Sequence, residues 1–532
     1  MRRLLALIVA VSGTGVWAAD FMTAGVDPGR TGWVKDEKVF TTSNVKDMKL
    51  LWKTKLDSTP REMHNLFPPI VLSSVTTSAG PKEIAVVAGI SDDLWGIDTA
   101  TGQEVWHKHF DSTYQPPAAG GPGGGQGGTL CPGGQTAAPT AGPGGTPGSY
   151  VVYAVSWDGR LRRVNAATGE DLVPPAKFMP PNAKPWSLNL VNEVIYTGIS
   201  QGCGGVTFSF FSYDLKTNKA SAFLPGGGGL WGRRGPAVTP ESTVWMGTGD
   251  GYYEPEAGHL GNSLVAVKLD ANQQLQPAGW YAPPNVNWLW HRDLDINVSP
   301  ISIDFKGKHL LFGTSKECRI WMVDRDVVTN TTPGSSHQQM LDRSPLICNP
   351  GARYDAAGVW GSLAVWVQNN QLHLAVPFLG KLADTYDSPV QIGKPQLGGV
   401  AVLKIDDTKW KFVPEWTYGD IDQGDEAVYA NGVLFVNAAG EDTYQVQAER
   451  AWNEPPRVQP PGGGRGSAVR IANSRRAAIY AFEAASGKLL WSSGDQITSW
   501  NHGSGMTAVN GKAYIGTFDG TLYCFGVPLA AK

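Results

Sequence analysis

The chain has 532 residues, with 44 Lys and Arg against 47 Asp and Glu, which gives a formal net charge of −3. Without an excess of basic side chains, the sequence indicates neither a nucleic acid nor an anionic membrane as a partner. It contains 66 Gly, 37 Pro and 20 Trp while only 17% of its residues are charged, a composition typical of a turn-rich all-β protein rather than a helical one.

The first 18 residues have the pattern of a secretory signal peptide. Arg2 and Arg3 precede an apolar run, and a small-residue site follows, so cleavage is expected after Ala18 or Ala19. The alternative is an uncleaved anchor, but the apolar run is too short to span a bilayer, and no other segment is apolar enough to cross one. The sequence therefore predicts a periplasmic or secreted protein with no membrane span.

A repeated pattern runs along the rest of the chain. Each copy is a short apolar strand ending in Asp, Asn or Glu, then a small polar turn, then a second strand that often carries Trp. The copies lie at 94–110, 161–175, 211–223, 264–280 and 479–493, and hairpins of alternating strands lie between them. A unit of about four strands that recurs every several tens of residues is typical of a β-propeller.

We predict an all-β fold, an eight-bladed β-propeller of four-stranded antiparallel blades that forms one domain over 19–532. The expected blade cores are 65–110, 136–178, 184–224, 229–282, 295–346, 357–418, 424–493 and 500–529. Segment 50–56 has strand character and is expected to pair into the last blade, which would close the ring and remove an open edge. The Gly- and Pro-rich stretches 116–148 and 453–466 are expected to be loop insertions.

The stretch HRDLDINVSP at 291–300 places Asp293 and Asp295 two positions apart in an apolar context. On a strand both side chains point to the same face, where two like charges repel. Such a pair is usually compensated by water, by a cation or by a catalytic task, and the residues alone leave these alternatives open.

The repeat resembles the tryptophan-docking motif of pyrroloquinoline quinone (PQQ) dehydrogenases, A-x-D-x-x-T-G-x-x-x-W, which IDTATGQEVW at 97–106 matches closely. The entry segment 25–53 also resembles the start of these proteins, so the resemblance covers almost the whole mature chain. It implies the propeller of the quinoprotein alcohol dehydrogenase-like family. The repeats are weak evidence for catalysis, because non-enzymatic scaffold propellers carry them too.

The resemblance also implies a cofactor site. Trp231, after a run of glycines, matches the Trp that forms the floor beneath the flat quinone, although a lone Trp is as often a core residue. Asp250 stands where the family has an Asn metal ligand, and a turn Asp is the alternative reading. Asp293 matches the catalytic carboxylate proposed as general base, and Asp295 matches an acid of members that use lanthanides.

Lys316 lies eight residues before the pair Asp324-Arg325, as in the family. The resemblance implies that it places an ammonium at the quinone carbonyl and stabilises the developing oxyanion. A solvated lysine at a strand end is the alternative. The register of Lys316 with Asp293 and Trp231 favours the role at the quinone.

One segment departs from the family pattern. Where the family has a metal-binding Glu and an Arg that contacts the quinone, this chain has Cys203 and Thr207, so the resemblance places both residues at the cofactor. A thiol is a poor ligand for calcium or a lanthanide. Two readings stay open: the three aspartates suffice as ligands, with Cys131 and Cys203 paired in place of the family's vicinal disulfide, or the site no longer binds PQQ and metal.

The other cysteines and the absent haem motif bear on redox partners. Cys318 and Cys348 lie in one blade and could also pair, which would leave Cys524 free, but connectivity cannot be read from the sequence. No C-x-x-C-H motif is present, so covalent haem is not expected and a separate electron carrier, such as a cytochrome c, would be needed.

The sequence thus predicts an exported PQQ-dependent dehydrogenase, with calcium or a lanthanide, that oxidises an alcohol or a sugar by hydride transfer to the quinone. Segment 358–376 also resembles polyvinyl-alcohol dehydrogenases, which points to larger or secondary alcohols. The alternative is a non-catalytic propeller that binds a protein or a polysaccharide. Cys203 and Thr207 favour this alternative, while Trp231, Asp293 and Lys316 favour the enzyme.

Overall fold

The computed structural model describes residues 18–112, 130–249, 251–355, 357–393, 395–419, 421–443, 467–503 and 505–528. Several predicted features lie outside these ranges. They are the signal peptide except for Ala18, the part of the first insertion up to residue 129, the second insertion at 453–466, and Asp250.

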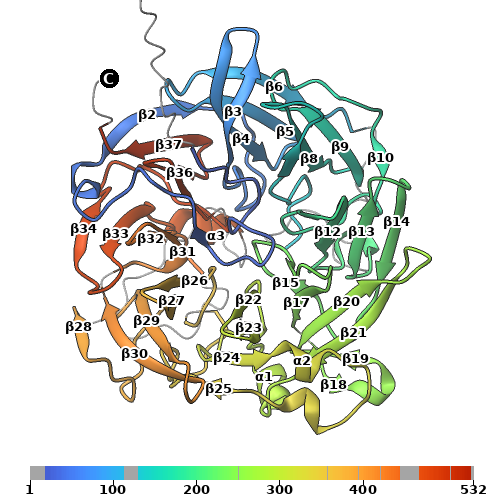
Figure 1. Cartoon of the computed structure of the whole chain (residues 1–532), viewed down its shortest axis with the longest axis vertical. Coiled ribbons are helices and arrows are strands. Elements are labelled where there is room, and N and C mark those ends of the chain that lie inside the picture. The colour runs from blue at the N-terminus through green and yellow to red at the C-terminus, as the bar shows by residue number, and fades with distance from the viewer. Residues whose placement is uncertain are drawn as a thin grey trace, which may run out of the picture.

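Eight antiparallel sheets stand around a common axis, and the chain visits them in order around the ring (Figure 1). The predicted eight-bladed propeller is therefore confirmed. Apolar side chains of facing sheets fill the space between blades; one such layer, between the fifth and sixth blades, includes Phe312, Met322, Leu374 and Leu403. Burial of this apolar surface is what makes each blade depend on its neighbours.

The first four blades span residues 70–281. From the centre outward their strands are β3 (Ile70–Thr77), β4 (Gly80–Gly89), β5 (Asp93–Asp98) and β6 (Glu104–His109); β7 (Thr140–Pro143), β8 (Tyr150–Val155), β9 (Arg160–Asn165) and β10 (Ala176–Lys177); β11 (Asn189–Val191), β12 (Val194–Gly198), β13 (Phe210–Asp214) and β14 (Lys219–Phe223); and β15 (Leu230–Trp231) with β16 (Ala237–Val238), β17 (Val244–Thr248), β20 (Leu264–Leu269) and β21 (Leu275–Tyr281). A small hairpin of β18 (Tyr253–Glu254) and β19 (His259–Leu260) projects from the fourth blade.

The last four blades complete the ring. Their strands are β22 (Ile301–Phe305), β23 (Lys308–Thr314), β24 (Ile320–Asp324) and β25 (Asp342–Arg343); β26 (Ala364–Gln368), β27 (Gln371–Leu379), β29 (Gly398–Asp406) and β30 (Lys411–Tyr418), with β28 (Val390–Ile392) beside β30; β31 (Gly424–Ala430), β32 (Val433–Ala438), β33 (Ala478–Glu483) and β34 (Leu489–Ser492); and β35 (Thr507–Val509), β36 (Lys512–Gly516) and β37 (Thr521–Gly526). The α-helices are α1 (Val286–Trp290), α2 (Arg325–Val328) and α3 (Ser467–Asn473).

The N-terminal part of the chain closes the ring. β2 (Lys49–Lys55) pairs antiparallel with β37, which confirms the strand predicted at 50–56, and β1 (Trp33–Val34) runs parallel beside β31. The last blade thus gains its outer strand from the other end of the chain, so its edge is covered. Within the predicted insertion 116–148, residues 140–143 form β7, the inner strand of the second blade.

Tryptophans at outer strands hold neighbouring blades together, as the repeat predicts. Trp106 of β6 lies over Gly169 in the turn of the next blade and donates its indole N–H to the Ala166 carbonyl at 2.8 Å. A Cβ on Gly169 would lie 2.7 Å from this ring, so a glycine is required there. The same contact recurs at two further interfaces, Trp416 on Gly487 and Trp52 on Gly102. None of the helices in the described ranges has the length and apolar character needed to span a bilayer.

Candidate functional site

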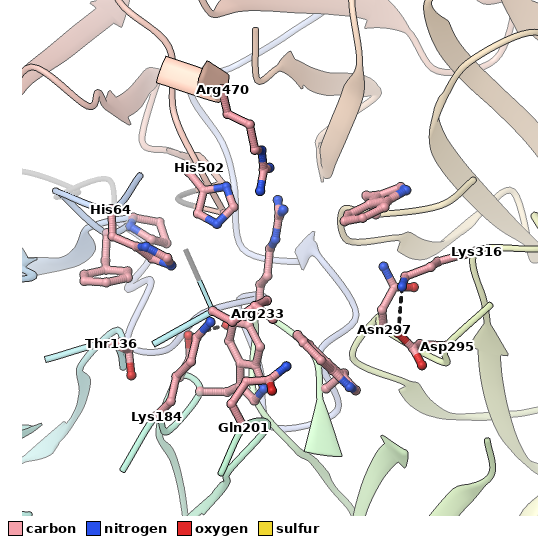
Figure 2. Close-up of a pocket in the computed structure, with 18 of the residues that line it drawn as sticks. His64, Thr136, Lys184, Gln201, Arg233, Asp295, Asn297, Lys316, Arg470 and His502 are labelled. Atoms are coloured by element: carbon pink, nitrogen blue, oxygen red, sulfur yellow. Dashed lines mark hydrogen bonds and ion pairs between the residues drawn. The ribbon is translucent and has the colours of Figure 1, made fainter. Parts of the chain in front are cut away.

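An open cavity lies where loops from most blades converge (Figure 2). Its walls come mainly from the segments that enter the inner strands, and its lining includes His64, Thr136, Lys184, Trp231, Asp293, Trp360 and His502. Inner strands of a propeller run in the same direction, so the loops that enter them gather at one end of the ring.

Four of the residues predicted from the sequence lie together in this cavity: Trp231, Asp293, Asp295 and Lys316. Cys203 and Thr207 do not line it; Cys203 is buried in a disulfide and Thr207 is exposed. Asp250, which follows Gly249, lies outside the described residues.

One wall is a carboxylate–ammonium cluster. The Lys316 ammonium donates to Asp295 Oδ2 at 2.7 Å, to Asp293 Oδ1 at 3.1 Å and to the Asp293 carbonyl at 3.0 Å. Burial alone would lower the pKa of Lys316, but Asp295 and Asp293 more than offset it and raise that pKa. The Lys316 ammonium therefore compensates the negative charge of the two aspartates.

The two aspartates differ in access to the cavity. The Asp293 side chain is 40% exposed, whereas that of Asp295 is 3% exposed. Asp295 fits because residue 249 is glycine, since a Cβ there would lie 2.4 Å from Asp295 Oδ1. Asp293 lies in the turn that follows α1 and not on the strand considered from the sequence, and it has a positive φ of 55°, which is uncommon outside glycine. Asp293 is thus the accessible carboxylate and Asp295 the buried counter-ion.

A second wall carries basic groups from other blades. Arg233 is paired with Asp425 and lies 3.7 Å from Glu441, and Glu441 also accepts from His502. Burial would raise the pKa of Glu441, but His502 and Arg233 lower it to about 2. At Asp425 burial raises the pKa of the carboxyl group to about 6, because the opposing effect of Arg233 is smaller. These contacts hold the Arg233 guanidinium at the edge of the cavity.

Lys184 lies on this second wall without an acidic partner. It is 4% exposed, and no carboxylate of the described residues lies within ion-pair distance of its Nζ, which stands 5.5 Å from the Trp186 ring centroid. Burial, with Arg233 and Arg470 nearby, lowers the pKa of Lys184 from 10.5 to about 7. An anionic ligand would supply the missing counter-charge.

Two histidines complete the lining. The rings of His64 and His502 meet edge to face with centroids 4.5 Å apart. Burial lowers the pKa of both histidines. At His502 the nearby Glu441 opposes this effect but does not cancel it. His64 Nδ1 is buried and has no hydrogen-bond partner in the described part of the chain.

Four residues of the lining were not predicted from the sequence: Lys184, Arg233, Arg470 and His64. The pair Arg233-Arg234, just after Trp231 in GLWGRRG, carried a usable signal, because basic residues beside a candidate cofactor floor are worth testing. Lys184 and Arg470 stand in segments without a motif. They reach the cavity only because the ring closes.

Both disulfides considered from the sequence are present, Cys131–Cys203 and Cys318–Cys348, and Cys524 is free and buried. The first joins residues 72 positions apart and fixes the neighbouring Leu130, which lines the cavity. A sulfur held in a disulfide offers no thiolate, so Cys203 cannot act as a metal ligand in this state.

No protein-family model matches the chain, and no curated protein sequence is similar to it. Solved structures do share the fold. A quinohemoprotein alcohol dehydrogenase from Comamonas testosteroni superposes with a TM-score of 0.57 at 16% identity, over 97% of this chain and 81% of that one. A quinohemoprotein alcohol dehydrogenase from Pseudomonas putida HK5 superposes with a TM-score of 0.55 at 13% identity, over 97% of this chain and 81% of that one.

A europium-containing methanol dehydrogenase superposes with a TM-score of 0.57 at 13% identity, over 96% of this chain and 98% of that one. At these identities the likeness concerns the fold, and it agrees with the repeat and with the entry segment. The chain therefore shares the eight-bladed propeller fold of these structures.

Proposed function

We propose that the protein is an exported PQQ-dependent dehydrogenase that oxidises an alcohol or a sugar. The observation that carries this proposal is the composition of the cavity. An aromatic floor and Lys184, which has no carboxylate partner among the described residues, face a carboxylate–ammonium cluster. PQQ is flat and carries three carboxylates, so it needs both an aromatic face and positive charge.

The residues of the cavity fit such a group. Trp231 has a buried indole nitrogen without a hydrogen-bond partner among the described residues, and its ring centroid lies 5.9 Å from that of Trp186. Lys184 stands where a carboxylate would restore charge balance, and Arg233 lines the same cavity. Thr136 adds a hydroxyl to the same cavity.

Calcium or a lanthanide, which the resemblance implies, fits less well. In the described ranges no three His, Cys, Asp or Glu residues form a group that could hold a metal ion, and Lys316 already donates to both Asp293 and Asp295. The predicted ligand set of Asp250, Asp293 and Asp295 remains a prediction.

Oxidation of an alcohol removes one proton from the hydroxyl and a hydride from the carbon. PQQ, when bound, supplies the acceptor of the hydride. We assign Asp293 to the proton, because it is the accessible carboxylate of the cluster. Lys316 holds Asp293 in position through two hydrogen bonds. Electrons would then leave to a separate carrier such as a cytochrome c.

Reconstitution tests the proposal. The purified protein is titrated with PQQ, alone and with calcium or a lanthanide, and followed by absorbance and by dye-linked oxidation of primary, secondary and polymeric alcohols and of sugars. We expect saturable quinone binding and substrate-dependent dye reduction. Absence of quinone binding under every metal condition would end the proposal.

A second candidate is a non-catalytic propeller that binds a protein or a polysaccharide. It is favoured by the place of Cys203 and Thr207, which supply neither the Glu nor the Arg that the family uses. The same titration separates the two functions, because a scaffold has no need of a quinone.

A further inference from the structure

The Lys316 ammonium is saturated with partners. It has three N–H donors, and the three acceptors lie at 2.7, 3.0 and 3.1 Å, two of them carboxylate oxygens and one the Asp293 carbonyl. Two aromatic rings cover it, with centroids 5.3 Å (Trp360) and 5.7 Å (Tyr354) from Nζ. This is a complete binding site for one ammonium group.

The backbone that carries Lys316 is fixed on several sides. Its N–H donates to the Asp295 carbonyl at 3.1 Å, and its carbonyl accepts from Asn349 Nδ2 at 2.7 Å. The disulfide Cys318–Cys348 links this turn to the segment that holds Asn349. At Gly358 a Cβ would lie 2.3 Å from the Lys316 carbonyl oxygen, so the loop packs against it closely. The side chain, 8% exposed, has little freedom to leave the aspartates.

A metal ion in the same place would compete with this ammonium. Calcium and lanthanides need six or more oxygen ligands, and Asp293 and Asp295 already direct oxygens to Lys316. Cys203, which stands where the resemblance expects a metal-binding Glu, is held in a disulfide. A second cation placed beside Lys316 would also be repelled by it.

We propose that the Lys316 ammonium is the resident cation of Asp293 and Asp295, and that this pair binds no calcium or lanthanide ion of its own. Lys316 then supplies the fixed positive charge beside Asp293 that an ion would otherwise supply. The inference concerns the cavity of the proposed dehydrogenase, but it does not depend on whether the quinone binds.

Terbium luminescence tests it on the full protein without quinone. Tb³⁺ emits strongly when a nearby tryptophan is excited, and Trp360 lies next to the Lys316 ammonium. The protein is dialysed against a chelator, and wild type, Lys316→Met, Lys316→Arg and Lys308→Met are titrated with Tb³⁺. Lys308 is the matched control, because it pairs with Asp324 at 2.7 Å in the same blade.

We expect no saturable emission from wild type, Lys316→Arg or Lys308→Met. Lys316→Met exposes two carboxylates without their cation, so its Tb³⁺ affinity should rise by at least about tenfold. One tightly bound Tb³⁺ per wild-type chain overturns the inference, and so does a folded Lys316→Met variant without a gain. Should Lys316→Met not fold, the wild-type titration, with metal content by mass spectrometry, decides alone. Loss of quinone binding with these results intact would count against the proposed function only.

Discussion

Two lysines face the same cavity and are buried to almost the same extent, yet their surroundings are opposite. Lys316 is 6% exposed and lies between two aspartates, while Lys184 is 4% exposed and has no carboxylate beside it in the described part of the chain. The pKa of the first is raised and that of the second is lowered. One cation thus belongs to the protein's own structure, and the other is available to an anionic ligand.

The largest expected effect concerns the accessible end of the paired cluster. Asp293→Asn keeps the shape of the side chain but cannot accept a proton, so dye-linked turnover of the PQQ-loaded protein should fall by about 10²–10⁴-fold. Quinone binding, followed by absorbance, should persist. Asp326→Asn, which changes an exposed carboxylate in the same part of the chain, is the control. Unchanged turnover in Asp293→Asn would remove this residue from the chemistry.

Stability should separate the two lysines next. Lys316→Met leaves the buried Asp295 carboxylate without its cation, which should lower the free energy of unfolding by about 3–5 kcal/mol. Lys184→Met removes a buried ammonium that has no carboxylate partner among the described residues and whose pKa is lowered by burial to about 7, so near neutral pH the free energy of unfolding should rise rather than fall. Urea denaturation of both variants measures the difference. An equal loss of unfolding free energy in both variants would contradict the distinction between a paired lysine and one without a carboxylate partner in the described ranges.

Ligand affinity should reverse that order. Without Lys184 a carboxylate of the quinone loses a charge-assisted hydrogen bond, so Lys184→Met should weaken PQQ binding by about 10–100-fold. Lys184→Arg keeps the cation and should stay near wild type. Quenching of tryptophan fluorescence reports the affinity. A wild-type affinity in Lys184→Met would mean that its charge serves another ligand.

The smallest effect is a pH dependence. The pKa of Lys184 is lowered from 10.5 to about 7, so between these values the unfolded chain holds one proton more than the folded one. Stability should therefore rise with pH in this window by up to about 1.4 kcal/mol per pH unit relative to Lys184→Met. Paired urea curves at pH 7.5 and 9 check this as a difference between the two proteins, which cancels the other titrating groups. PQQ affinity should fall over the same range in wild type alone.

Much of the fold was predictable because its signals are local. The turn glycine and the Trp of IDTATGQEVW lie within one repeat. The glycine allows close approach of a neighbouring ring, and the Trp docks on the next blade, so the residue types alone indicate both tasks. The strand at 50–56 could be assigned because a propeller needs its edge covered. Cys318 and Cys348 were a candidate pair because they lie in one blade, and the structure joins them.

The site was predictable only in part. Trp231, Asp293, Asp295 and Lys316 lie in motifs that resemble a family, and the structure brings them into one cavity. Lys184 and Arg470 come from segments far apart in the chain, and nothing near them in the sequence marks them. Cys203 and Thr207 were placed by alignment to a pattern that this loop does not follow, since a disulfide holds it instead.

The sequence by itself determined the blade repeat, the closure of the ring and the presence of two carboxylates on one segment, because each depends on residues that are neighbours or follow a fixed period. Tertiary structure alone decided what those carboxylates bind. Asp293 and Asp295 meet Lys316 across the start of the fifth blade. Lys184 lies near arginines from other blades, with no carboxylate beside it in the ranges that the structure describes. Charge balance in a buried cavity depends on groups that only the closed ring brings together.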